Sequence, residues 1–176
     1  YDGSFSLNNS GAGMGGMLTF VEAGVSAGNP GDVAGPLVAT VASQPDVTNG
    51  TVGVQIAASI SDVATGNSNI MAAEYFIDTI GADGNGNAMV VSVSTPAAIV
   101  NGTISVAQLG GLASGKHTIY VHGMDSAGNW GNTNFTVLNL DKQGPLTGGL
   151  VLSPNPSNGV VQVTLSATAD DQTTGN

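Results

Sequence analysis

Apolar and polar residues alternate along much of the chain, in short runs separated by turn-forming residues. The clearest run covers residues 52–60, where Val, Val, Ile, Ala and Ile at even positions alternate with Gly, Gln, Ala and Ser. A period of two places successive side chains on opposite faces of a strand. We therefore expect a β-strand here, with one buried face and one face toward solvent.

Six further runs have the same character and bring the expected number of strands to seven. They cover residues 37–42, 70–78, 88–94, 102–107, 117–124 and 133–140. Residues that tolerate positive φ separate the runs at Asn49-Gly50, Asn101-Gly102, Gly128-Asn129 and residues 81–87. Short strands with turns at this spacing are typical of an all-β sandwich, which is the predicted fold class.

One segment of the chain occurs twice. Residues 36–67 align with residues 145–176 without a gap, at an offset of 145 − 36 = 109 residues, and 12 of the 32 aligned positions are identical. The repeat predicts a complete unit over residues 36–144 and the first strands of a following unit over residues 145–176. Residues 1–35 are then an N-terminal extension or the end of a preceding unit, with residues 16–24 as its candidate strand.

The charge balance excludes several classes of partner. Charged residues make up 8% of the chain, with 2 Lys+Arg against 12 Asp+Glu and a net charge of -10. Lys116 and Lys142 cannot form the basic surface that nucleic acid or an anionic membrane requires. No apolar run approaches the roughly 18 residues of a membrane span, so we expect no membrane insertion. Because the chain has no Cys, neither a disulfide nor a thiolate contributes.

Two stretches resemble a known family. Residues 112–131, LASGKHTIYVHGMDSAGNWG, resemble the last two strands of bacterial and archaeal immunoglobulin-like surface domains of the Big and fibronectin type III-like kinds. The turn of those domains commonly reads Asp-x-Ala-Gly-Asn, here Asp125, Ala127, Gly128 and Asn129. Residues 140–145, LDKQGP, resemble their Asp-x-x-x-Pro joints, whereas Thr118 departs from the corner Tyr of fibronectin-like relatives. The resemblance implies immunoglobulin-like sandwiches in tandem, outside the cell.

Carboxylates at predicted strand ends are candidate metal ligands. Asp62, Asp125 and Asp141 fall at or near such ends, where the resemblance implies structural calcium between successive domains, and Asp171 repeats Asp62. Carboxylates, amide side chains and loop carbonyls supply the hard oxygen ligands that Ca²⁺ prefers. The alternative is that Asp125 and Asp141 cap turns through nearby backbone amides.

A second candidate calcium site is the sequence DGNGN. Asp83, Asn85 and Asn87 place oxygen-bearing side chains at positions one, three and five, as in the first half of a calcium loop. Ala88 and Ser94 then stand where an EF-hand requires Gly and a bidentate Glu. A hairpin turn is therefore the alternative interpretation.

The sequence predicts no enzyme. The strings GAGMGG (residues 11–16) and GVSAG (residues 24–28) match a dinucleotide fingerprint and a nucleophile elbow, but neither is followed by the helix that such a site requires. His117 and His122 are five residues apart on one predicted strand, so they face opposite sides and cannot share a metal. We expect each to be a hydrogen-bonded structural residue.

These observations favour a structural segment of an extracellular filament or tandem stalk at the cell surface. Its expected partners are neighbouring copies of itself, joined by strand donation, or adjacent domains of the same chain. The alternative is an adhesin or an accessory binding module attached to a secreted enzyme. In that case residues 81–87 or 125–130 would supply the ligand contacts.

Overall fold

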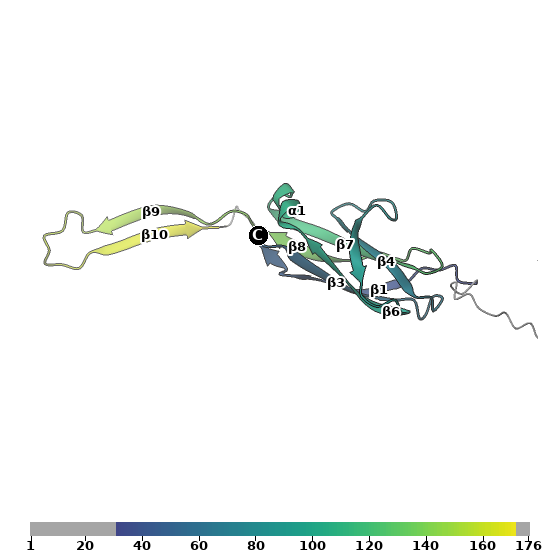
Figure 1. Cartoon of the computed structure of the whole chain (residues 1–176). Coiled ribbons are helices and arrows are strands. Elements are labelled where there is room, and N and C mark those ends of the chain that lie inside the picture. The colour runs from purple at the N-terminus through teal and green to yellow at the C-terminus, as the bar shows by residue number, and fades with distance from the viewer. Residues whose placement is uncertain (1–30, 172–176) are drawn as a thin grey trace, which may run out of the picture.

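The computed structural model describes residues 31–171 (Figure 1). The candidate strand at residues 16–24 and the two enzyme-like motifs lie outside the described residues. The elements are β1 (Leu37–Gln44), β2 (Val47–Thr48), β3 (Val54–Ser61), β4 (Ile70–Ile77), β5 (Asn87–Val91), β6 (Ala97–Ile104), α1 (Val106–Gly111), β7 (Gly115–Asp125), β8 (Asn134–Leu140), β9 (Leu146–Ser153) and β10 (Thr164–Asp170).

Eight strands form one sheet in the order β1-β3-β6-β5-β4-β7-β8-β2. Neighbouring strands are antiparallel except β2, which pairs in parallel with β8. The short strand β5 joins the two halves, because it pairs with β6 on one side and with β4 on the other. The prediction of an all-β fold is confirmed for the described residues, with α1 as their one helix.

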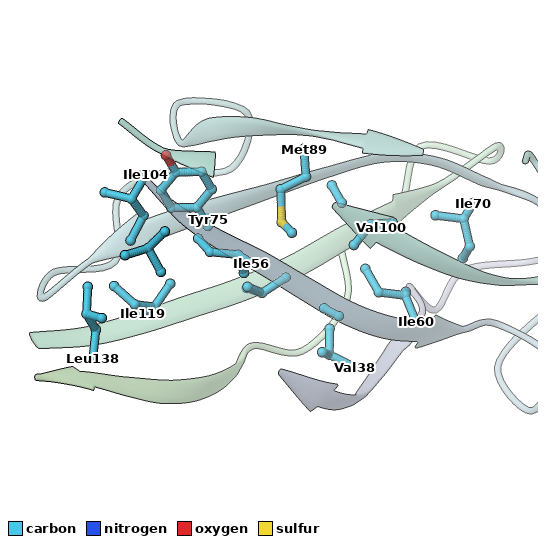
Figure 2. Close-up of a cluster of buried hydrophobic side chains, with 14 of the residues drawn as sticks. Val38, Ile56, Ile60, Ile70, Tyr75, Met89, Val100, Ile104, Ile119 and Leu138 are labelled. Atoms are coloured by element: carbon cyan, nitrogen blue, oxygen red, sulfur yellow. The ribbon is translucent and has the colours of Figure 1, made fainter. Parts of the chain in front are cut away.

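Both halves of the sheet contribute to a single hydrophobic core (Figure 2). The alternation seen in the sequence places Val54, Ile56, Ala58 and Ile60 of β3 in this core, all essentially inaccessible to solvent. The opposite half contributes Tyr75, Ile119, Val121 and Leu138 from β4, β7 and β8. The Tyr75 hydroxyl donates to the carbonyl of Thr103 at 2.8 Å, so its polar end has a partner.

The strand predicted at residues 102–107 is wrong at both ends. Strand β6 begins earlier, at Ala97, and ends at Ile104, and Val106 already lies in α1. Ser105 caps this helix, because its hydroxyl accepts from the Gln108 amide while the Gln108 side chain reaches back to the Ser105 amide. This reciprocal pair is a capping box, which starts a helix where the apolar pattern alone suggests a strand.

The turn predicted at Asn101-Gly102 is also wrong, because both residues lie inside β6. A side chain at residue 102 would crowd the core, because a Cβ there would come within 3.1 Å of Met89 and 3.3 Å of Tyr75. The turns predicted at Asn49-Gly50 and Gly128-Asn129 are confirmed. Gly50 and Gly128 have φ of +80° and +91°, the region that favours glycine.

Strands β9 and β10 form a separate antiparallel hairpin, and its residues are exposed along both strands. In Figure 1 this hairpin extends away from the main sheet beyond the end of β8. Among residues 31–171, no helix has the length and apolar character needed to cross a bilayer.

Candidate metal centre

Asp62 directly follows β3 and organises the loop that leads to β4. Its backbone carbonyl accepts from the amides of Thr65, Gly66 and Asn67. Its carboxylate accepts from the Thr65 hydroxyl and, at 2.7 Å, from the amide of Ser68. The residue is completely buried. A buried carboxylate with several donors is held in a fixed orientation.

Asp125 is the last residue of β7, and it is also completely buried. Its Oδ1 accepts from the amides of Ala127 and Asn129 at 2.8 and 2.9 Å, and its Oδ2 accepts from the Asn129 side chain at 3.1 Å. The alternative interpretation, that Asp125 caps its turn, is therefore confirmed. The Asp-x-Ala-Gly-Asn pattern is explained by these bonds, together with the positive φ of Gly128.

Asp32 brings a third carboxylate to the same place. One carboxylate oxygen from each of Asp32, Asp62 and Asp125 lies within 4.8 Å of the other two, and we call these three residues the acidic cluster. Asp32 belongs to the joint segment, defined as residues 31–36, which enters the sheet at β1. The acidic cluster thus connects the joint segment to the ends of β3 and β7.

The joint segment reaches this position through close contacts at three glycines. A Cβ at Gly66 would lie 2.0 Å from the Asp32 carboxylate carbon, so only glycine leaves room for that side chain. A Cβ at Gly35 would lie 2.3 Å from the backbone of Trp130, and one at Gly131 would lie 1.7 Å from the carbonyl oxygen of Pro36. The joint segment is therefore packed directly onto the turn that follows β7.

Hydrogen bonds keep Asp32 in its ionised form. The Ser68 hydroxyl donates to Oδ2 at 2.6 Å and the Ala34 amide to Oδ1 at 3.2 Å. The Ser68 bond is the main reason that the pKa of Asp32 lies below its usual value; burial opposes this lowering, and the Ala34 bond adds to it. The carbonyl of Asp32 also accepts from the Asn129 side chain at 3.2 Å.

The sequence found two members of the acidic cluster and missed the third. Asp62 and Asp125 lie at strand ends, as predicted, and the structure brings them together, but Asp141 does not join them. It follows β8, which runs antiparallel to β7, so it lies at the opposite end of the sheet. There Asp141 accepts from the Gln143 amide at 3.1 Å, which confirms its predicted turn capping. Asp32 was missed because it lies in the segment assigned to a preceding unit, although Asp32 and Asp141 are themselves 109 residues apart.

The loop with Asp83, Asn85 and Asn87 is organised around another carboxylate. Buried Glu74 accepts from the amides of Gly84 and Gly86 at 2.8 and 2.6 Å, so the loop folds over its side chain. Asn85 closes a turn with Ala82, and the Asn87 side-chain oxygen accepts from Gln108 at 3.0 Å. The Asp83 side chain is 61% exposed. The three predicted ligands thus have separate environments in a tight turn.

Both histidines are hydrogen-bonded structural residues, as expected. His122 Nε2 lies 2.7 Å from the Glu74 carboxylate, and its ring packs on Trp130 with 4.5 Å between centroids. His117 Nδ1 lies 2.7 Å from Asp78, and its Nε2 lies 2.9 Å from the Ala113 carbonyl. Burial alone would lower the pKa of His117, but these hydrogen bonds and the Asp78 charge outweigh burial and raise it.

The chain matches no protein-family model, and no curated protein matches it at a significant level. The acidic cluster and the strand order therefore carry the functional argument.

Proposed function

We propose that the chain is a structural segment of an extracellular array of immunoglobulin-like β-sandwich units, in which calcium fastens each joint to the unit that follows it. The observation that carries this proposal is the meeting of Asp32, from the joint segment, with Asp62 and Asp125 of the unit body.

The strand order supports an immunoglobulin-like unit. In such sandwiches the first, second, fourth and fifth strands form one sheet, and the third, sixth and seventh form the other. Strands β1, β3 and β6 match the first group, and β4, β7 and β8 match the second. Strand β5 lies between the two groups and pairs with both. Strands β1 and β2 together correspond to the first strand of the sandwich. Because β1 pairs with β3 and β2 pairs with β8, this first strand is divided between the two sheets.

The electrostatics of the acidic cluster favour a bound cation. Carboxylates this close together repel one another when they are ionised, and a bound cation would offset that repulsion. The two lysines of the chain lie elsewhere. Lys142 donates to the carbonyls of Gly110 and Leu112. Lys116 is nine residues before Asp125 on β7, which is about 30 Å along a strand. Neither lysine therefore balances the charge of the acidic cluster.

Calcium fits the donor atoms and their spacing. Ca²⁺ binds oxygen ligands at about 2.3–2.6 Å, so oxygens that share one ion lie within about 5 Å of each other. The separations within the acidic cluster meet this condition. Backbone carbonyls and water would complete the coordination, as Ca²⁺ takes six to eight oxygens in flexible geometry.

A cation in the acidic cluster would have a mechanical effect. Without it, the joint segment is held by packing at Gly35 and Gly131 and by hydrogen bonds such as that from Asn129 to the Asp32 carbonyl. With it, a charged contact binds Asp32 to the ends of two core strands. Restricting a joint in this way straightens and stiffens a row of units, a role that needs no catalytic centre.

Thermal unfolding in calcium and in chelator tests this proposal. Calcium at about a hundred times its Kd should add about 2.7 kcal/mol and raise Tm by about 10 °C. The Asp32→Asn variant should melt lower than the wild type in calcium because it lacks a ligand. In chelator it should melt no higher than the wild type, because the Ser68 and Ala34 hydrogen bonds favour the ionised Asp32 carboxylate even without a cation. Equal Tm values for the wild type in the two buffers would contradict the proposal.

Electron microscopy of native material tests the array itself. A row of such units should appear as rods with a repeat of roughly 35–45 Å per unit, given strands and loops of this size. Addition of a chelator should make the rods more flexible. Isolated globular particles attached to a larger catalytic body would instead support an accessory binding module.

A further inference from the structure

The hairpin β9–β10 pairs its residues as β1 and β3 do, at the repeat offset of 109 residues. In the first pair Val38 is opposite Ile60, Ser43 is opposite Ile56, and Gln44 is opposite Gln55. In the second pair Thr147 is opposite Ala169, Leu152 is opposite Leu165, and Ser153 is opposite Thr164. Each number in the second set is the first plus 109. Each first strand also carries an irregularity in register near the same place.

The segment between the paired strands is repeated as well. Gly50 has φ of +80° and donates its amide to the Thr48 hydroxyl at 3.1 Å. Its counterpart Gly159 has φ of +79° and donates to the Ser157 hydroxyl at 3.1 Å. The amides of Thr51 and Val160 likewise both bind the Asn two residues before them. The pairing of β1 with β3 and the turn around Gly50 are thus built a second time, whereas β2 has no counterpart among the described residues.

The two hairpins differ in what covers their apolar face. Ile56, Ala58 and Ile60 of β3 are buried against β4, β7 and β8. Their counterparts Leu165, Ala167 and Ala169 are exposed, and so is Leu152 opposite Leu165. A two-stranded hairpin alone is at best marginally stable in water, so an apolar face of this kind requires a cover.

We propose that β9–β10 is half the core of a second unit, that a strand equivalent to β6 pairs beside β10, and that strands equivalent to β4, β7 and β8 cover the apolar face, all supplied by the same polypeptide. A second copy of the chain is the less suitable source, because its own β4, β7 and β8 already cover its own β3. This inference rests on the tandem part of the proposed function. It deepens that proposal by naming the covering strands.

The same offset predicts which acidic residues serve the second unit. Asp141 corresponds to Asp32, and Asp171 corresponds to Asp62. The bond from the Gln143 amide to Asp141 at 3.1 Å reproduces the bond from the Ala34 amide to Asp32 at 3.2 Å. Asp141 then belongs to the joint segment of the next unit, which explains why it lies far from Asp62 and Asp125.

The test extends the full chain with its own strands. A second copy of residues 68–144 is attached after Asn176, the counterpart of Asn67, so that the order of elements continues as in the first unit. Hydrogen exchange by mass spectrometry then compares the amides of β9 and β10 in the extended and original chains. We expect exchange to slow by roughly a hundredfold or more when the hairpin is covered.

Matched substitutions in the extended chain show which face is covered. Leu165→Asp, on the proposed core face, should abolish the protection. Ser166→Asp, on the opposite face of the same strand, should retain it. Equal loss of protection in both variants would overturn the proposal. So would protection in the original chain that increases with protein concentration, because a second copy would then be the cover.

A second chimera keeps the inference testable if the extension fails to fold. Replacing residues 36–67 of the full chain by residues 145–176 exchanges segments of equal length. We expect the amides of β4 and β7 to remain protected. The inference would be overturned if β9 and β10 were unprotected in the extended chain and β4 and β7 were unprotected in the second chimera.

Calcium stoichiometry separates this inference from the proposed function. The extended chain contains Asp141, Asp171 and a second copy of Asp125, so the number of bound calcium ions should rise from one to two. Protected β9 and β10 with no calcium bound would support the second unit and contradict calcium as the fastener. The opposite result would be calcium bound to the original chain, with no protection of β9 and β10 in the extended chain or of β4 and β7 in the second chimera. That result would support calcium as the fastener and contradict the second unit.

Discussion

The carboxylate of Asp32 lies directly against Gly66, where a Cβ would be only 2.0 Å from its Cγ atom. This contact joins the segment before β1 to the loop after β3. It means that the position of Asp32, and hence the geometry of the acidic cluster, depends on the absence of a side chain at residue 66.

Gly66→Ala should therefore weaken calcium binding without removing a ligand. The added methyl group displaces Asp32, and loss of such supporting contacts typically reduces metal affinity by about 10–100-fold. Calcium titration measures the effect. Gly110→Ala is the matched control, because a Cβ there meets nothing within 4 Å, and its affinity should equal that of the wild type. Unchanged affinity in the Gly66→Ala variant would contradict the assigned position of Asp32.

Glu74→Ala should be strongly destabilising. Removing this carboxylate leaves the amides of Gly84 and Gly86 and the ring of buried His122 without their partner. Each buried donor left without a partner costs about 1–3 kcal/mol. Urea unfolding measures the loss, and hydrogen exchange should show faster exchange at Gly84 and Gly86. Asp83→Ala is the control and should change stability little, since Asp83 is mostly exposed and 3.8 Å from His122.

Ser43→Ala should stabilise the protein. The Ser43 hydroxyl is buried and has no hydrogen-bond partner, and its counterpart in the second hairpin is Leu152. A buried polar group without a partner costs about 1–3 kcal/mol, so its removal should add about 1 kcal/mol. Ser59→Ala, on the opposite face of β3, should change stability by less than about 0.5 kcal/mol. Destabilisation of the Ser43 variant would contradict the prediction, because it would show that the hydroxyl has a hydrogen-bond partner.

His117 should make stability depend on pH. Its pKa is raised in the folded state, so the imidazole binds its proton more tightly in the folded protein than in the unfolded chain. This stabilisation is complete below the unfolded pKa of about 6.5 and is lost as pH rises through the higher folded value. An NMR titration of the ring gives the folded pKa directly. In Asp78→Asn the folded pKa should fall, and a pKa below about 6.5 in the wild type would contradict the prediction.

Most strands could be predicted from the sequence because their burial follows a period of two. Residues 52–60 show this most clearly, and β3 differs from the prediction mainly by starting at Val54. Strand β2 could not be found in this way, since two residues carry no pattern and their pairing depends on β8, almost a hundred residues later. The helix α1 did have a local signal in Ser105 and Gln108, the two residues of its capping box.

The acidic cluster could be predicted only in part for a similar reason. Asp62 and Asp125 mark ends of strands that run to the same end of the sheet, so alternation and turn chemistry bring them together. Asp32 lies in a segment without periodicity, and its position depends on Gly35, Gly66 and Gly131. Glycines that make space for a neighbour leave no local pattern. Only the repeat, by aligning Asp32 with Asp141, marks this carboxylate in the sequence.

Isothermal titration of chelator-treated protein with Ca²⁺ tests the central claim most directly. The account predicts one calcium ion per chain and binding that is lost or strongly weakened in Asp32→Asn, while Asp83→Asn binds as the wild type does. Calcium that fails to bind, or that binds Asp32→Asn and the wild type equally well, would contradict the claim that a cation fastens the joint segment to the unit.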